Sequence, residues 1–252
     1  MANTKRPQSP KGTSFRGTYK WPKLNDPDYG TKDYPKENGE FSVKLVGELS
    51  DPDVQAFIAK WQPMHDEAIA RAKEEFKGLK VEVRKKLKEV TVNPLYTEIY
   101  DEETEEPTGK IEIKFAMTYS GVYKSGPKQG KKWFRRPAIF DAKGNQMSPP
   151  PSIWGGTIGR VAFEVGLNKE GQPGYFIPAT GAAGLTLRLQ AARVLQLVSE
   201  GQRDAGSYGF GEEEEGYEYD PSRAQSSNDD AGQDDQTDGS EDKAGGESNP
   251  DF

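Results

Sequence analysis

Cysteine is absent from this chain of 252 residues, and histidine occurs only once. The lack of cysteine excludes disulfide bonds, thiolate zinc sites and cysteine nucleophiles. The single histidine, His65, has no nucleophile elbow near it, so we expect it at the surface or edge of a helix rather than in a catalytic triad. A Walker-type phosphate loop (GxxxxGKS or GxxxxGKT) is also missing, which disfavours nucleotide hydrolysis.

Long apolar runs are missing as well. Nothing approaches the roughly 18 apolar residues of a membrane-spanning helix, and the opening MANTKRPQSPKGTS lacks the apolar region of a signal peptide. We therefore expect a protein that is neither membrane-bound nor secreted. Hydrophobic residues make up 33% of the sequence, but the shortage is concentrated toward the two ends, and the middle has the composition of an ordinary globular domain.

Charge is divided unevenly along the chain. Residues 204–252 contain 16 acidic and 2 basic residues, a net charge of −14, whereas residues 1–203 contain 32 basic and 25 acidic residues, a net charge of +7. The acidic segment cannot bury enough apolar surface to offset chain entropy, so we predict a disordered tail. A basic body joined to an acidic tail indicates a body that binds a polyanion and a tail that competes for the same surface.

The tail carries Phe252 directly after Asp251, beyond a stretch that is almost free of hydrophobic side chains. An aromatic ring beside carboxylates suits peptide docking, because the ring can fill a pocket while the carboxylates pair with basic side chains of a partner. We therefore predict Asp251 and Phe252 as partner-docking residues.

Residues 41–203 carry the pattern of a mainly β domain with a helical insertion. Strand-like segments occupy residues 41–49, 95–101, 110–120, 133–141 and 157–165. The second and third of these flank an acidic turn and should form a hairpin. Residues 184–198 fit both a strand and a helix, and the Gly-rich entry to this segment favours a strand. Such short strands are compatible with a small Greek-key barrel.

The helical insertion is expected to follow Asp51 and Pro52, because aspartate is a good N-cap and proline suits the first helical turn. We expect Pro63 to interrupt this helix and Gly78 to end it. The buried face should repeat at a spacing of four residues in the second half.

Residues 1–40 contain too few aliphatic side chains for a packed element, so we predict an extended basic N-terminal arm over the domain surface. Phe15, Tyr19 and Trp21 lie beside basic residues in this arm. These aromatic side chains suit either a nucleic-acid groove or a subunit contact, and the sequence leaves the two open.

The segment from Tyr119 to Arg136 interleaves aromatic and cationic side chains around a Gly-containing loop. Unpaired nucleic acid needs this combination, because cations replace the counterions of the phosphates and aromatic faces stack the bases at ~1–3 kcal/mol each. Burial in the core is an equally good account of any single aromatic here. The predicted single-stranded DNA (ssDNA) contacts are Tyr119, Tyr123, Lys124, Lys131, Lys132, Trp133, Arg135 and, in a separate Pro-rich loop, Trp154.

Strand alternation limits this site. Trp133 and Arg135 project to one face of their strand, whereas Phe134 and Arg136 project to the other, so both pairs cannot line one groove. A second basic run, residues 80–88, could flank the groove as phosphate contacts, but it contains no aromatic side chain and equally suits an exposed strand or helix end.

Two alternatives to a DNA-coating role remain. Asp101 followed by Glu112 and Lys114 loosely matches the Asp…Glu-x-Lys pattern of magnesium-dependent nucleases, although charge alternation on a strand produces the same spacing. The acidic tail could instead serve as a chaperone of a basic partner. The favoured DNA-binding role requires neither a metal nor a cofactor.

Several of these features together resemble the ssDNA-binding proteins of tailed bacteriophages. FDAKGNQMSPPPSIWGGTIGRVAFEV and YFIPATGAAGLTLRLQAARVLQL are similar to the central and last barrel strands of that family, and the acidic tail ending on Asp-Phe is similar too. The resemblance implies a five-stranded OB-fold-like barrel with a helical insertion over residues 41–203.

The resemblance also implies a function. It suggests a non-enzymatic protein that coats ssDNA during phage replication, recombination and repair in the cytoplasm of the infected bacterial host. In the family the tail recruits replication proteins such as DNA polymerase and helicase and competes with DNA for the groove. Members differ in oligomeric state, so the resemblance leaves both a monomer and a homodimer open.

Overall fold

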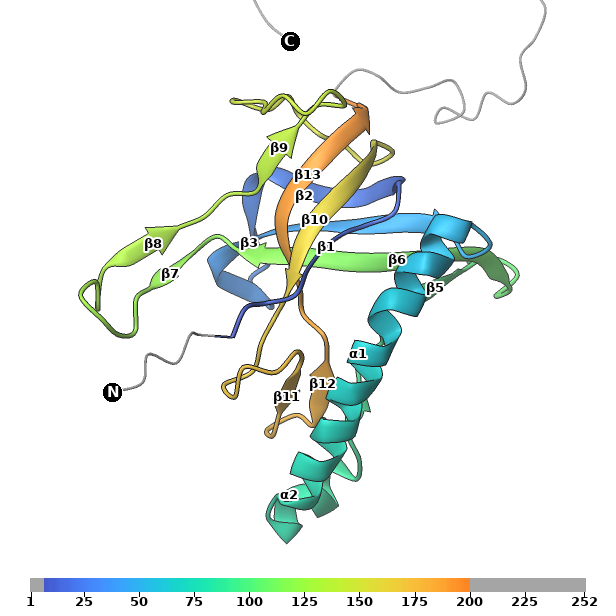
Figure 1. Ribbon diagram of the computed structural model, residues 1–252. Coiled ribbons are helices and arrows are strands. Elements are labelled where there is room, and N and C mark those ends of the chain that lie inside the picture. The colour runs from blue at the N-terminus through green and yellow to red at the C-terminus, as the bar shows by residue number, and fades with distance from the viewer. Residues whose placement is uncertain (1–6, 200–252) are drawn as a thin grey trace, which may run out of the picture. The chain divides into compact units, whose positions relative to one another are not determined.

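The computed structural model describes residues 7–199 (Figure 1). The predicted disordered tail and its docking residues Asp251 and Phe252 lie outside this range. The elements are β1 (Lys11–Thr13), β2 (Gly17–Gly30), β3 (Pro35–Glu48), α1 (Pro52–Lys77), α2 (Val81–Leu87), β4 (Thr91–Val92), β5 (Thr97–Tyr100), β6 (Pro107–Thr118), β7 (Ser120–Val122), β8 (Lys132–Phe134), β9 (Ala138–Phe140), β10 (Ile158–Val165), β11 (Tyr175–Ile177), β12 (Ala182–Gly184) and β13 (Leu187–Gln196).

Five strands close into a barrel. β2 pairs with β3, β3 with β6, β6 with β13, β13 with β10, and β10 again with β2. All these pairs are antiparallel except β6 and β13, which run parallel. The chain is thus mainly β with an OB-fold-like barrel and a helical insertion between β3 and β6, as the resemblance implied. The expected hairpin is also present, because β5 pairs antiparallel with β6.

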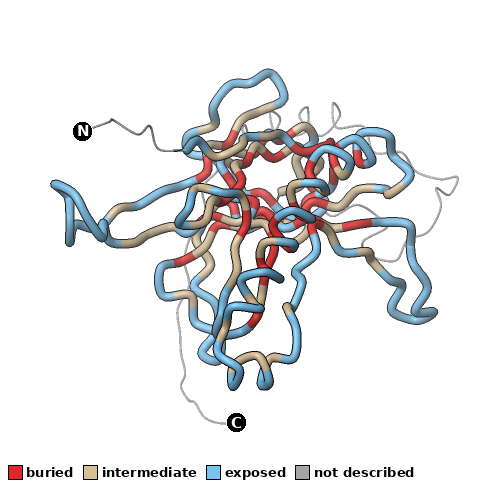
Figure 2. Tube along the Cα trace, turned by 60° about the horizontal axis from the view of Figure 1, so that its bottom comes forward, coloured by how far each residue is buried: buried red, intermediate tan, exposed pale blue. Residues whose placement is uncertain are grey.

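Strand alternation builds the core of this barrel. On β6, Ile111, Ile113 and Phe115 are buried, whereas Glu112 and Lys114 between them face outward. A period of two places every second side chain on the same face of a strand. The buried residues gather in the middle of the described fold, and the projecting loops are exposed (Figure 2).

The ambiguous segment 184–198 forms strand β13, which follows β10 with register shifts typical of β-bulges. The segment 133–141, in contrast, is not one strand. It divides into β8 and β9, which pair with different partners on either side of Pro137. A proline has no N–H to donate to a strand ladder, which accounts for the break.

The predicted N-terminal arm is wrong over the described part of residues 1–40. This segment supplies β1, β2 and the start of β3, and Phe15 and Tyr19 are buried in the barrel. The Tyr19 hydroxyl lies 2.9 Å from the carbonyl oxygen of Arg160 and 3.0 Å from that of Arg193, and burial raises the pKa of this hydroxyl. Local composition concealed these strands partly because β1 and the start of β2 pair with β10, which lies more than a hundred residues further along the chain.

Helix α1 begins where the sequence predicts, with the Asp51 carboxylate accepting a hydrogen bond from the Asp53 amide at 2.7 Å, and Gly78 follows its last turn. The predicted interruption at Pro63 does not occur. Pro63 and Ala59, four residues earlier, both lie on the exposed face, so the carbonyl that loses its helical donor is on the solvent side. The buried face runs on both sides of the proline, through Val54, Phe57, Trp61, His65, Ala68, Ile69 and Ala72.

His65 is therefore not a surface or helix-edge residue, as was expected. It is almost fully buried, and its Nε2 lies 2.8 Å from the carbonyl oxygen of Asn93, to which it donates. The histidine thus ties α1 to the segment after β4, and the small sheet of β11, β12 and β4 lies beside the helix (Figure 1). Neither helix within residues 7–199 has the length and apolar character needed to span a membrane.

Candidate nucleic-acid interface

The predicted aromatic and basic segment forms a short hairpin of β7 and β8, a two-stranded sheet separate from the barrel sheet. Figure 1 shows this hairpin projecting from the barrel. Gly121 of β7 lies opposite Trp133 of β8, and a Cβ atom at Gly121 would collide with the indole ring. Glycine at this position therefore lets the Trp133 ring lie across the facing strand.

Cation–π contacts divide the hairpin into two faces. The Arg135 guanidinium lies 4.2 Å from the ring centroid of Trp133. On the other face, Arg136 lies 5.6 Å from the ring of Tyr119, and Phe134 packs against the same tyrosine with centroids 5.4 Å apart. The structure thus separates the two pairs, as strand alternation predicts, and it does not bring Tyr119 together with Trp133.

We use the term hairpin surface for the tip of this element together with the face that carries Trp133 and Arg135. The Tyr123 ring lies 5.8 Å from the Lys128 ammonium. Three further lysines at the tip are exposed and have no ion-pair partner within residues 7–199. The hairpin surface comprises Tyr123, Lys124, Lys128, Lys131, Lys132, Trp133 and Arg135.

A second aromatic and basic site lies on the barrel, centred on Trp21. The register of β2 and β3 shifts between Lys20 and Lys23, so that Trp21 occupies a β-bulge with φ +50°. The ring is 64% exposed, and the ammoniums of Lys20 and Lys44 lie 4.6 and 4.8 Å from its centroid. A non-glycine residue with positive φ is strained, and such strain collects at functional sites.

Glu112 completes this cluster. Its carboxylate accepts hydrogen bonds from Lys20 at 2.9 Å and from Lys44 at 2.5 Å. Burial raises the pKa of the Glu112 carboxyl, but the two lysines lower it by more, so that the pKa lies below the ordinary value. The carboxylate therefore stays ionised at neutral pH, and both lysines are fixed beside Trp21.

Trp154 belongs with Trp21 rather than with the hairpin. Both tryptophans are exposed and line one pocket of ≈ 550 Å³. Asn25 of β2 anchors the Trp154 loop, because its side-chain amide donates to the Pro151 carbonyl at 2.7 Å and accepts from the Ile153 amide at 3.0 Å. We call Lys20, Trp21, Lys44 and Trp154 the barrel surface.

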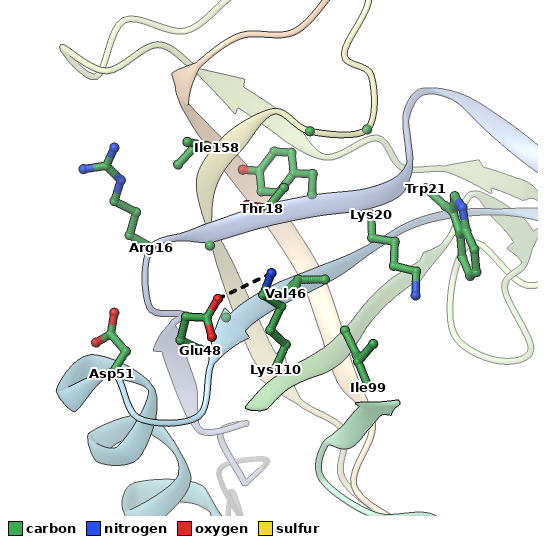
Figure 3. Close-up of a pocket in the computed structure, with 15 residues that line it drawn as sticks. Arg16, Thr18, Lys20, Trp21, Val46, Glu48, Asp51, Ile99, Lys110 and Ile158 are labelled. Atoms are coloured by element: carbon green, nitrogen blue, oxygen red, sulfur yellow. Dashed lines mark ion pairs between the residues drawn. The ribbon is translucent and has the colours of Figure 1, made fainter. Parts of the chain in front are cut away.

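A second pocket, of ≈ 660 Å³, adjoins the first, since Trp21 and Gly155 line both. Figure 3 shows Lys20 and Trp21 side by side at one end of it. Farther along the same pocket, the Lys110 ammonium pairs with the Glu48 carboxylate at 3.6 Å (Figure 3). The exposed aromatic ring of Trp21 thus lies between these two adjoining pockets.

The geometry does not support the nuclease alternative. Asp101 accepts hydrogen bonds from the backbone of its own turn, including the Thr104 amide at 2.9 Å, which lowers the pKa of its carboxyl. Glu112 is occupied by two lysines, and Lys114 pairs with Glu40 at 3.3 Å. Among residues 7–199 no three His, Cys, Asp or Glu side chains are grouped in a way that could hold a metal ion.

The second basic run does not flank either surface. Most of residues 80–88 form helix α2, none of whose residues is buried. Figure 1 places this helix at the far end of α1 from the barrel. The run is thus a solvated helix, the alternative that the sequence had left open.

Comparison with known proteins gives one family match. The sequence model of the family described as single-stranded DNA-binding protein, bacteriophage T7, matches residues 17–197. No curated protein matches the chain. The crystal structure of gp2.5, a single-stranded DNA binding protein encoded by bacteriophage T7, is similar with a TM-score of 0.58 and 22% identity, covering 84% of this chain and 100% of that chain.

Another similar structure is the single-stranded DNA-binding protein from bacteriophage Enc34, as a C-terminal truncation. It has a TM-score of 0.41 and 15% identity, and the match covers 74% of this chain and 85% of that chain. The likeness to the T7 structure shows that the fold is shared.

Proposed function

Because the chain belongs to the single-stranded DNA-binding protein family of bacteriophage T7, we propose that it binds unpaired DNA through the hairpin surface and the barrel surface. Proteins of this family are binding proteins and not enzymes. The observation that supports this proposal most directly is the pairing of tryptophan rings with cations: Arg135 lies over the half-buried Trp133, and Lys20 and Lys44 lie over the exposed Trp21. This arrangement offers a stacking face for a base next to positive charge for its phosphate.

The proposed contacts keep most of the residues that the sequence suggested. Tyr123, Lys124, Lys131, Lys132, Trp133 and Arg135 act on the hairpin, and Trp154 acts on the barrel. Trp21 and Lys20 are added from the segment whose role the sequence left open, and Lys44 is new. Tyr119 is reassigned to a supporting role, because it packs between Phe41 and Phe134.

We further propose that the protein coats single strands exposed during replication, recombination and repair of phage DNA in the cytoplasm of the infected bacterial host. The uneven charge supports a role for residues 204–252 as a competitor for the DNA surface. In this proposal Asp251 and Phe252 dock onto replication proteins such as DNA polymerase and helicase. Deleting residues 204–252 should tighten DNA binding at low salt and abolish that docking, and an unchanged affinity would contradict the competition.

A fluorescence titration with oligothymidylate tests the proposed site. Stacked bases quench tryptophan emission, so quenching should fall in W133A, W154A and W21A, and each affinity should weaken by about 1–3 kcal/mol if that ring stacks a base. Y100A is a matched control, because Tyr100 is exposed on β5 outside both surfaces. Equal effects of all four substitutions would reject these surfaces as the binding site.

A further inference from the structure

Three charged side chains from adjacent barrel strands meet at Trp21. Lys20 of β2 lies directly opposite Lys44 of β3, and Glu112 of β6 reaches both. The two carboxylate oxygens are divided between the lysines, since Oε2 accepts from Lys20 and Oε1 accepts from Lys44. The same two ammoniums contact the Trp21 ring. A single carboxylate thus fixes both cations that support the indole.

Burial distinguishes this arrangement from a loose surface ion pair. The Glu112 side chain is 13% exposed, and the side chains of Lys20 and Lys44 are about one-third exposed. Charges shielded to this degree are screened less by salt than fully exposed ones. We call the two ion pairs of Glu112 with Lys20 and Lys44 the Glu112 clamp. This clamp should therefore persist at the ionic strength at which DNA binds.

Such support matters for Trp21, because its residue lies in a β-bulge and its side chain is largely exposed. A freely rotating side chain loses entropy when a base stacks on it, and a side chain already held in place loses less. Fixing the ring before DNA arrives therefore strengthens stacking without any contact between the fixing group and the DNA.

We propose that Glu112 is a positioning residue for base stacking on Trp21, acting through Lys20 and Lys44. This inference rests on the proposed function for its DNA-binding consequence, but the clamp itself is a property of the free protein. Glu112 would thus contribute to DNA binding, although its negative charge by itself repels the DNA phosphates.

Net charge alone gives the opposite expectation, which makes the test sharp. E112Q removes one negative charge near the site, so electrostatic attraction by itself would tighten the binding of oligothymidylate. Loss of the clamp should instead weaken binding by roughly threefold or more, a part of the effect of losing a stacked base. E164Q is the matched control, because Glu164 of β10 carries the same charge, pairs with Arg188 at 4.0 Å and lies outside both surfaces.

A double-mutant cycle separates positioning from a general effect on folding. With Trp21 replaced in W21A, the further change E112Q should no longer weaken binding, because the ring that the clamp holds is absent. If E112Q weakens binding equally in both backgrounds, or tightens it in both, the proposal is overturned.

A measurement without DNA distinguishes failure of this inference from failure of the proposed function. In a W133F/W154F background only Trp21 and the buried Trp61 emit. Time-resolved fluorescence anisotropy should then show added nanosecond motion of Trp21 in E112Q and none in E164Q. Unchanged motion would refute the clamp even if DNA binds, whereas increased motion in a protein that fails to bind oligothymidylate would refute only the DNA-binding site.

Discussion

The Arg136 guanidinium donates a hydrogen bond of 3.2 Å to the backbone carbonyl of Asn25, which joins the base of the β7–β8 hairpin to strand β2. Asn25 also anchors the loop that carries Trp154. The base of the hairpin and the Trp154 loop are therefore both tied to one residue of β2.

Asn25→Ala tests this junction. The substitution removes the side-chain hydrogen bonds to the Trp154 loop and leaves their partners unsatisfied, which should lower the free energy of unfolding by about 1–3 kcal/mol. It should also weaken oligothymidylate binding as much as W154A does, because Trp154 loses its fixed position. Asn38→Ala is the control, since this exposed residue uses only its backbone carbonyl in a hydrogen bond to Ser120. Full affinity in N25A would show that the loop does not place Trp154 for binding.

Lysines of the two surfaces should differ in their salt dependence. Lys131 is exposed without an ion pair in the described part of the chain, so it is free to replace a counterion on DNA. K131Q should reduce the log–log slope of affinity against salt by about 0.7. Lys44 shares the Glu112 carboxylate with Lys20, which offsets part of its charge, so K44Q should weaken binding with a smaller change in slope than K131Q. Binding titrations over a series of salt concentrations measure both, and equal slope changes would contradict the distinction.

Gly121→Ala should weaken DNA binding without destabilising the barrel. The added methyl group collides with the Trp133 ring and must displace it, so affinity for oligothymidylate should fall by up to the ~1–3 kcal/mol expected for W133A. The melting temperature should hardly change, because β7 and β8 form their own two-stranded sheet. Val122→Ala is the matched control, since Val122 is an exposed neighbour on the same strand. A large loss of thermal stability in G121A would place the hairpin in the folding unit of the barrel.

Several features of the fold follow from local pattern. The alternation around Ile111 and Phe115 correctly gives β6, and Asp51 with Pro52 correctly gives the start of α1. These signals are local, because side-chain period and capping depend on neighbours in sequence. Residues 1–40 behave differently, since the burial of Tyr19 depends on β10 and β13, which lie more than a hundred residues away.

The candidate site shows the same division. The hairpin surface lies in one continuous segment, so its aromatic and basic composition is visible in the sequence. The barrel surface combines Lys20 and Trp21 from β2, Lys44 from β3 and Trp154 from a distant loop. Nothing in the spacing of these residues links them, because strand pairing brings them together. Only the unusual placement of Trp21 among basic residues hinted at a role.

Stability in acid should depend on Glu112. Its pKa in the folded protein lies below the ordinary value of 4.5, so the unfolded chain binds a proton more readily than the folded one. The stabilisation is therefore present above about pH 4.5 and is lost as the pH falls through the lower folded pKa. Urea unfolding of the wild type should give a lower free energy of unfolding at pH 3 than at pH 7, and the loss at Glu112 should be one part of that difference.

E112Q should remove the contribution of Glu112 to the fall in unfolding free energy between pH 7 and pH 3. This contribution is up to about 1 kcal/mol for a partly exposed ion pair. The difference in unfolding free energy between pH 7 and pH 3 should thus be smaller in E112Q than in the wild type. E164Q should retain more of the wild-type difference, because the Glu164 carboxylate pairs with a single cation, Arg188, at the longer distance of 4.0 Å. An E112Q protein with the full wild-type pH dependence would mean that the two lysines do not stabilise the ionised carboxylate, and the support under Trp21 would lose its electrostatic basis.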